Sequence, residues 1–145
     1  MSRSHESSHE FEVEQGMEVL PIDECERRLA AGGVGILALA GIDAPVLRPV
    51  NFVLHEGSLW IRTGEGQILA AAQSGEPASF VLTEIDRFEH TGWSVVATGK
   101  LAERSASGAD DLPLRPWARA EKHHFVGLAI DRISGRRIAV GARKP

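Results

Sequence analysis

Apolar and polar residues alternate with a period of two in several short stretches of this chain. The clearest stretches are VGILALA (34–40), SLWIRT (58–63) and GWSVVATGKLAE (92–103). Because successive side chains of a strand point to opposite faces, this period predicts β-strands rather than helices. Turn signals such as Glu56-Gly57 lie between the stretches, so we expect most of the strands to be joined as hairpins.

The remaining elements complete a mainly β pattern. The further strands are PVLRPVNFVLH (45–55), in which Pro45 and Pro49 indicate an edge or a bulge, ASFVLTEI (78–85), and FVGLAIDRISGRRIAV (125–140), which supplies one strand or a pair. The helices are PIDECERRLAAGG (21–33), with Asp23 as its predicted cap, and QILAAAQS (67–74), with a further helical turn expected within LRPWARAEKHH (114–124). This order predicts a six-stranded antiparallel barrel with two or three short peripheral helices.

The length of 145 residues fits a single domain. Residues 1–13 are charged, serine-rich and aperiodic, which predicts a disordered tail and leaves residues 14–145 as the folded domain. No apolar run reaches the roughly 20 residues of a membrane helix, so no membrane contact is expected. Cys25 is the only cysteine, which excludes an internal disulfide and favours the cytoplasm. The net charge of -4 argues against a nucleic-acid partner.

A glycine-containing bend, Arg62-Thr63-Gly64-Glu65-Gly66, connects a predicted strand to the helix at 67–74. Backbone N–H groups, the Thr63 hydroxyl and the Arg62 guanidinium would suit a phosphate group at such a bend. The alternative is that the two glycines serve only the geometry of a tight turn. The bend lacks the ending of a nucleoside-triphosphate loop and is too short for the dinucleotide fingerprint.

Three longer segments carry a family resemblance: DECERRLAAGGVGILAL (23–39), PVNFVLHEGSLWIRTGEGQILAAA (49–72) and TGWSVVATGKLAE (91–103). In these segments the chain resembles the flavin-binding split barrels related to pyridoxamine 5'-phosphate oxidase, most of all their small actinobacterial flavin-nucleotide-binding branch. Fainter similarity continues through Pro116-Trp117 and ISGRRI (133–138). The resemblance implies a six-stranded split β-barrel that forms a homodimer and holds FMN in clefts between its subunits.

The resemblance also implies a set of cofactor-binding residues. It places Arg48, Pro49, Val50 and Asn51 along the isoalloxazine ring, Ile61, Arg62 and Thr63 along the ribityl chain and phosphate, Gly66 and Gln67 at the helix that caps the phosphate, and Trp93 and Ser94 on the partner subunit's side of the flavin. Arg136 or Arg137 would reach the site across the dimer. A deazaflavin would use the same phosphate-binding site and is the alternative cofactor.

This chain departs from the family pattern at two places. Relatives commonly read T-x-x-G-x-K, whereas Ile68 stands at the lysine position here. Loss of a charged hydrogen bond to phosphate would cost about 1.5–3 kcal/mol, which Arg48, Arg62, Gln67 or Arg136 could offset. The segment GRRIAVGARKP (135–145) does not reproduce the arginine- and histidine-bearing end of the true oxidase. Vitamin B6 oxidation is therefore not expected.

The expected function is a small flavin-dependent oxidoreductase of unknown substrate, because a flavin supplies redox chemistry without a catalytic constellation on the protein. A non-catalytic flavin or deazaflavin carrier is the alternative, favoured by Ile68. Haem is a weaker candidate because no histidine occupies a convincing axial position.

Other polar or reactive residues have simpler interpretations. The HESSH stretch (5–9) matches a zinc signature but lies in the predicted tail, so we expect no metal site there. His123 and His124 are adjacent and would point to opposite faces of a strand; His124 is a candidate for the flavin cleft, although a surface or packing role is expected. Cys25, Trp60 and Trp93 fit packing positions, and Asp110-Asp111 fits a solvated loop.

Overall fold

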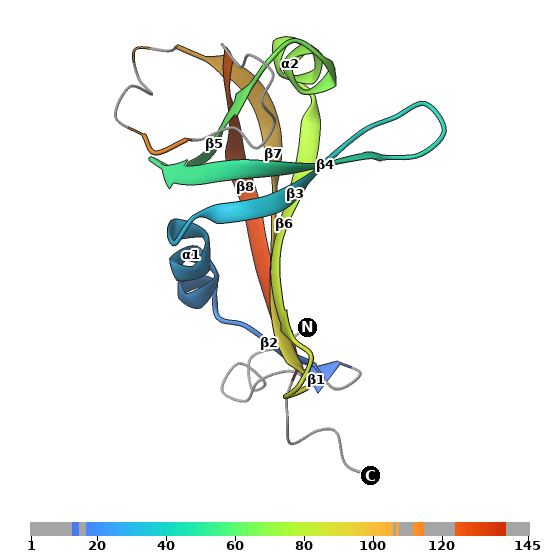
Figure 1. Cartoon of the computed structure of the whole chain (residues 1–145), viewed down its shortest axis with the longest axis vertical. Helices are drawn as coiled ribbons and strands as arrows, with labels where there is room; N and C mark the ends of the chain where they lie inside the picture. The colour runs from blue at the N-terminus through green and yellow to red at the C-terminus, as the bar shows by residue number, and fades with distance from the viewer. Residues whose placement is uncertain (1–12, 15–16, 106, 108–111, 115–123, 139–145) are drawn as a thin grey trace, which may run out of the picture.

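The computed structural model of the chain describes residues 13–14, 17–105, 107, 112–114 and 124–138. Its strands are β1 (Val13–Glu14), β2 (Met17–Val19), β3 (Gly33–Leu39), β4 (Val46–His55), β5 (Ser58–Thr63), β6 (Pro77–Asp86), β7 (Thr91–Arg104) and β8 (His124–Ile138), and its helices are α1 (Ile22–Ala30) and α2 (Gln67–Gln73). The last predicted segment is one long strand rather than a pair. Figure 1 shows these elements along the chain.

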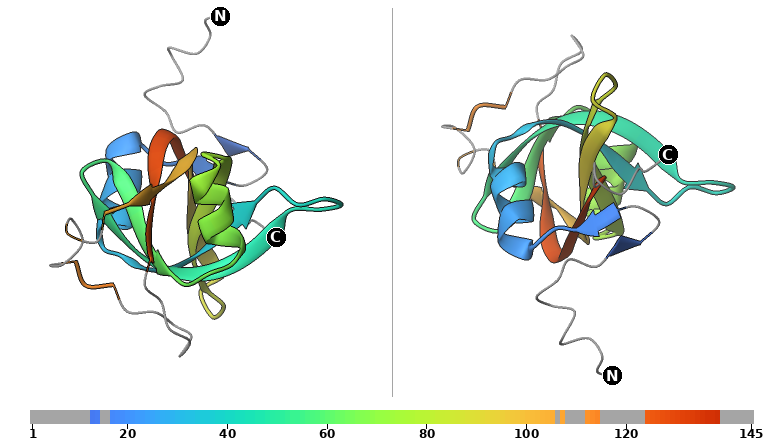
Figure 2. Two further views of the ribbon diagram at one scale, coloured as in Figure 1. Left: turned by 90° about the horizontal axis from the view of Figure 1, so that it is seen from above. Right: turned by 90° about the horizontal axis from the view of Figure 1, so that it is seen from below.

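Six of the strands close into an antiparallel barrel. They follow the order β8-β5-β4-β3-β6-β7, and β7 pairs back onto β8. Figure 2, which views the molecule from above and from below, shows the strands curving around a common centre. The predicted six-stranded antiparallel split barrel is therefore confirmed. β1 and β2 were not predicted; β2 extends the sheet by pairing with the end of β8, from Arg136 to Ile138.

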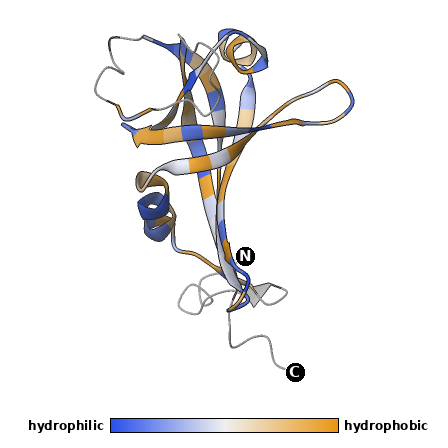
Figure 3. Cartoon of the chain, in the orientation of Figure 1, coloured by the Kyte–Doolittle hydropathy of each residue, from blue (hydrophilic) through white to orange (hydrophobic). Residues whose placement is uncertain are grey.

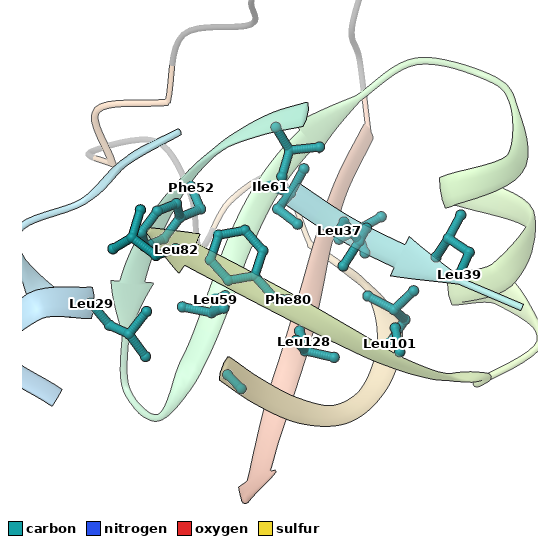
Figure 4. Close-up of a cluster of buried hydrophobic side chains, with 14 of the residues drawn as sticks. Leu29, Leu37, Leu39, Phe52, Leu59, Ile61, Phe80, Leu82, Leu101 and Leu128 are labelled. Atoms are coloured by element: carbon teal, nitrogen blue, oxygen red, sulfur yellow. The ribbon is translucent and has the colours of Figure 1, made fainter. Parts of the chain in front are cut away.

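The alternating pattern of the strands produces the core. Along β3, the side chains of Leu37 and Leu39 are buried while their neighbours are only partly covered. Phe52 of β4 and Phe80 of β6 meet edge to face, with their ring centroids 4.8 Å apart (Figure 4). Figure 3 shows apolar and polar segments alternating along the strands, as the period of two predicts. Burial of the inward-facing apolar side chains thus stabilises the barrel, and β5 is buried on both faces from Ser58 to Ile61.

Helix α1 packs against β8 through a close contact between a sulfur atom and a glycine. Cys25 is fully buried, and a Cβ atom added at Gly135 would lie 2.6 Å from its Sγ. The predicted packing role of Cys25 is confirmed, and burial raises the pKa of its thiol. The predicted cap is wrong: the helix begins after Pro21 without a side-chain cap, and Asp23 instead accepts a hydrogen bond from Arg27 at 3.2 Å.

Helix α2 lies over a different part of the barrel, where it packs on β7 and β8 (Figure 1). Its buried residues are Leu69, Ala71 and Ala72, and the small alanine side chains allow the helix to approach the strands closely. The chain reaches α2 directly from β5, so the end of β5 and the start of the helix form one corner of the molecule.

One side of β4 remains partly open. β4 pairs with β3 from Val46 to Phe52, but it pairs with β5 only from Val53 to His55. No described strand therefore pairs with the β5-facing side of residues 46–50. Pro49, which has no N–H to donate, is compatible with this position because one side of the strand has no ladder to complete. The predicted edge position of Pro49 is confirmed.

Several predictions fall outside the described residues. These are the disordered tail over residues 1–12, the HESSH stretch, the loop aspartates 110–111, residues 115–123 of the segment 114–124 in which a helical turn is expected, Pro116-Trp117 and His123. Val13, the last residue of the predicted tail, pairs with Glu18 in the ladder between β1 and β2.

Candidate functional site

The bend between β5 and α2, residues 64–66, is the first part of the candidate site. Gly66 immediately precedes α2 with φ of 143°, a backbone conformation that favours glycine. Thr63, the last residue of β5, is buried, and its hydroxyl donates a long hydrogen bond of 3.4 Å to the Gly64 carbonyl. The turn geometry thus accounts for Gly66, as the simpler of the two sequence interpretations requires.

A hydrogen bond joins this corner to the open side of β4. Arg48 Nη2 donates to Gln67 Oε1 at 2.7 Å, and Arg48 Nη1 donates to the Leu47 carbonyl at 3.0 Å. Arg48 and Gln67 are both exposed, and they come from segments that are far apart in the sequence. Two residues that the resemblance assigns to the ring and to the phosphate therefore meet in the folded chain.

The open side of β4 presents backbone polar groups of alternate residues. His55 and Ser58 face each other across the two-residue turn Glu56-Gly57, so the polar backbone groups of His55 point toward β5. Because backbone orientation alternates along a strand, those of Pro49 and Leu47 point to the same side, beyond the end of β5. Pro49 contributes only its carbonyl, while Leu47 contributes its N–H and a carbonyl that already accepts a hydrogen bond from Arg48.

The side chains of the predicted site residues divide into exposed and buried ones. Arg62 is exposed, with its guanidinium carbon 5.8 Å from the centroid of the Phe125 ring. Ile61 and Val50 are buried in the core, at 1% and 7% exposure, and Asn51 is half-buried beside a cavity of about 290 Å³. Ile61 and Val50 can therefore offer a ligand no side chain.

Ile68 has a structural role. Its side chain is partly buried and packs against the main core cluster. The position at which the family resemblance implies a lysine is thus turned toward the barrel in this chain. Of the described arginines near the corner, Arg48 of β4 contacts the first residue of α2, whereas the Arg62 side chain lies over the Phe125 ring on the other face of β5 from Thr63.

Trp93, Ser94 and Arg136 lie at the far end of the barrel. Trp93 borders a cavity of about 650 Å³, and the Arg28 guanidinium lies over its ring at 4.3 Å from the centroid. Ser94 pairs with Arg136, whereas Thr63 pairs with His124 at the other end of β8. Arg136 lies twelve residues after His124, which corresponds to about 40 Å of strand. One chain therefore does not bring these three residues to the corner that holds Arg62 and Thr63.

His124 forms a polar network at the corner that the sequence analysis did not predict. Its Nδ1 lies 3.1 Å from Glu103 Oε2 and its Nε2 lies 3.2 Å from Glu65 Oε2. The hydrogen bond with Glu103, followed by that with Glu65, raises the pKa of the imidazole, while Gln73 and then His124 lower the pKa of Glu103. The three residues are far apart in the sequence, so only the register of β8 with β5 and β7 reveals the network.

Within the described ranges, no group of three or more histidine, cysteine, aspartate or glutamate side chains could hold a metal ion. None of the described helices is long and apolar enough to cross a membrane.

Comparisons with known proteins agree with the fold. A family model described as pyridoxamine 5'-phosphate oxidase matches residues 21–137. The Mycobacterium tuberculosis protein Rv0080 is 27% identical over 133 residues, which cover 85% of this chain and 86% of that protein. The solved structure of the FAD-binding protein from Mycobacterium smegmatis has 25% identity and a TM-score of 0.69, covering 83% and 97% of the two chains. An FAD-binding protein from Mesorhizobium loti has the same fold at 21% identity, with a TM-score of 0.67 and coverage of 83% and 96%.

Proposed function

Since this chain belongs to the pyridoxamine 5'-phosphate oxidase family, we propose that it binds FMN between two copies of itself and acts as a small flavin-dependent oxidoreductase in the cytoplasm. The flavin binding of the Mycobacterium smegmatis relative, which is named for FAD, supports a flavin nucleotide as the ligand. FMN is the specific proposal because the corner of β5 and α2 suits a single terminal phosphate.

The observation that carries this proposal is the contact between Arg48 and Gln67 at 2.7 Å. It joins the open side of β4 to the first residue of α2. A ligand that combines a planar polar ring with a phosphate matches this surface, because the ring can meet backbone groups of β4 while the phosphate meets guanidinium groups at the corner. Arg48 lies between the two parts and could contact either.

The second copy is part of the proposal because of where the remaining residues lie. Trp93, Ser94 and Arg136 are about 40 Å of strand away from the corner, measured along β8. A twofold symmetric dimer can bring this end of one subunit to the corner of the other. Exposed apolar side chains on two hairpins, Ile42, Leu47, Ile85 and Phe88, offer surface that such a dimer would cover.

The roles of the chain's own residues in this function are binding and orientation. A bound flavin supplies the redox chemistry. Arg48 and Arg62 would hold the phosphate, and the backbone of Leu47 and Pro49 would orient the edge of the ring. Trp93 of the partner subunit would cover a face of the ring.

Calorimetry and absorption spectroscopy test this function. The purified chain should bind FMN in the micromolar range, and Arg48→Ala should weaken the binding about tenfold through loss of a charged hydrogen bond. Arg132→Ala is the matched control because Arg132 is an exposed arginine in the middle of β8. Riboflavin should bind more weakly than FMN because it lacks the phosphate.

Chromatography of flavin released from freshly purified protein separates FMN from FAD and from a deazaflavin. A colourless protein that gives no heat with any of the three would refute the proposal.

A non-catalytic carrier is the second candidate function, and the packing of Ile68 favours it because no lysine is turned toward the phosphate. Anaerobic mixing of the flavin-loaded protein with NADH or NADPH separates the two functions. An oxidoreductase that accepts one of these donors bleaches the flavin absorbance faster than free FMN does, whereas a carrier gives no protein-dependent rate.

A further inference from the structure

His124 is held between two carboxylates at the proposed phosphate corner. It is the first residue of β8 and pairs with Thr63, so its side chain lies at the mouth of the barrel beside the bend 64–66. Nδ1 faces Glu103 at 3.1 Å and Nε2 faces Glu65 at 3.2 Å. Each ring nitrogen of His124 thus contacts one carboxylate oxygen.

The two carboxylates belong to different elements. Glu65 is the central residue of the bend, and Glu103 lies near the end of β7, where it also accepts a hydrogen bond of 3.2 Å from Gln73 at the end of α2. The network therefore links the bend, β7, β8 and the last residue of α2. Only an imidazole that carries both protons can donate to two carboxylates. His124 therefore donates hydrogen bonds to Glu65 and Glu103 at the same time only when its imidazole is charged.

The charge of Glu65 matters at this corner. Its carboxylate is part of the bend that the proposed function assigns to a phosphate, and two anions at one site repel each other. The imidazolium offsets the Glu65 charge while it also ties the bend to β7. No lysine helps at position 68, because Ile68 packs against the core.

We propose that the protonated imidazole of His124 positions the bend 64–66 for the flavin phosphate and offsets the charge of Glu65 beside it, so that flavin binding weakens when the imidazole loses its proton. This inference rests on the proposed FMN binding. His124 is a positioning residue: it acts on the phosphate through Glu65.

The direction of the pH dependence follows from the charged groups around the ring. Among the described residues, the titratable groups that face the ring are Glu65 from the bend and Glu103 from β7; α2 presents the neutral Gln73, and Arg62 lies on the other face of β5 from Thr63. The carboxylates raise the pKa of His124 above its ordinary 6.5. The link is therefore complete below about pH 6.5 and is lost as the pH rises through the raised pKa.

Titration of the binding constant between about pH 5.5 and pH 8.5 tests this inference. Relative to His124→Gln, in which ionisation of the FMN phosphate acts without the histidine, the FMN affinity of the natural chain should fall about threefold to fivefold as the pH rises, the size of an exposed ion pair. At low pH, His124→Gln should bind FMN about threefold to fivefold more weakly than the natural chain. The histidine-dependent decrease in affinity with rising pH should be absent from this variant. Glu65→Gln should bind FMN at least as tightly as the natural chain, and the histidine-dependent decrease in affinity with rising pH should also be absent from it. His55→Gln is the matched control because His55 is a partly exposed histidine on another strand.

Two features of the experiment separate the possible failures. The FMN phosphate gains charge as the pH rises through about 6, which strengthens binding to arginines and so acts in the opposite direction; riboflavin, which has no phosphate, should show no His124-dependent change.

Proton NMR of the flavin-free protein measures the pKa of His124 directly. This pKa should lie above 6.5 in the natural chain and should be lower in Glu65→Gln and in Glu103→Gln. If FMN binds with the same pH dependence in all variants, only the role of His124 is refuted. If no flavin binds at any pH, the proposed function fails with it.

Discussion

At the scale of single residues, Ile68 shows how one substitution changes both packing and charge. Its partly buried side chain packs against the core, so the proposed phosphate site would instead take its positive charge from Arg48, Arg62 and a protonated His124. Sequence alone identified Ile68 as a departure from the family pattern. It could not show that the side chain contributes to the core, since that depends on how α2 packs on β7 and β8.

Replacing Ile68 with lysine should raise the affinity for FMN and lower the free energy of unfolding. In Ile68→Lys we expect FMN affinity to rise about tenfold, the value of a charged hydrogen bond to phosphate. The free energy of unfolding should fall by about 1 kcal/mol because an apolar contact with the core is lost, although the lysine stem retains part of it. Calorimetry and urea unfolding measure the two effects. Ala70→Lys adds the same charge at an exposed position of the same helix and should change neither by much; an equal gain in affinity there would point to general electrostatics.

At the scale of secondary structure elements, the sequence predicted most of the barrel because each strand carries its own alternation. β2 was missed because its three residues, Met17 to Val19, are too few to show a period, and they pair with the distant end of β8. The cap of α1 was misassigned because Asp23 matches a cap in the sequence, whereas Pro21 occupies the cap position and the helix begins at Ile22. The contact of Arg48 with Gln67 and the His124 network depend on strand register, which alternation does not specify.

The packing of α1 on β8 gives a prediction at this scale. Gly135→Ala should lower the free energy of unfolding by about 1–3 kcal/mol, because the new Cβ would lie 2.6 Å from Cys25 Sγ. Cys25→Ala alone should cost about 1 kcal/mol through a small cavity. The double variant should be more stable than the sum of the two losses implies, by at least about 0.5 kcal/mol. Strictly additive values in urea unfolding would mean that the sulfur atom and the glycine are not in contact.

At the scale of the whole molecule, the predicted site residues occupy two separate regions of the barrel. Arg48, Gln67 and Arg62 lie at the corner between β4, β5 and α2, while Trp93 and Arg136 lie toward the opposite end of β8. Sequence resemblance supplied both sets, but only the folded chain shows how far apart they are. A binding site made from both sets requires two subunits.

Mixing of variants tests this division of the site. Arg48→Glu and Trp93→Ala dimers should each bind FMN weakly, since each loses one half of every site. When the two chains are refolded together, mixed dimers should carry one intact site each, so about a quarter of all sites should recover the natural affinity. Arg48→Glu mixed with Arg62→Glu is the control and should recover none, because both changes affect the same half. If the first mixture also recovers none, the site lies within one chain.

The open side of β4 has a consequence for how the molecule behaves without its ligand. An unpaired strand edge normally invites a strand of another chain, which leads to aggregation. Pro49 directs its nitrogen to this side and has no hydrogen to donate there, so an incoming strand would leave one of its carbonyl groups without a partner. A small molecule needs only a few of the edge's groups and does not meet this obstacle. In the proposed function, the proline would make this edge a poor template for fibril growth without closing it to a small molecule.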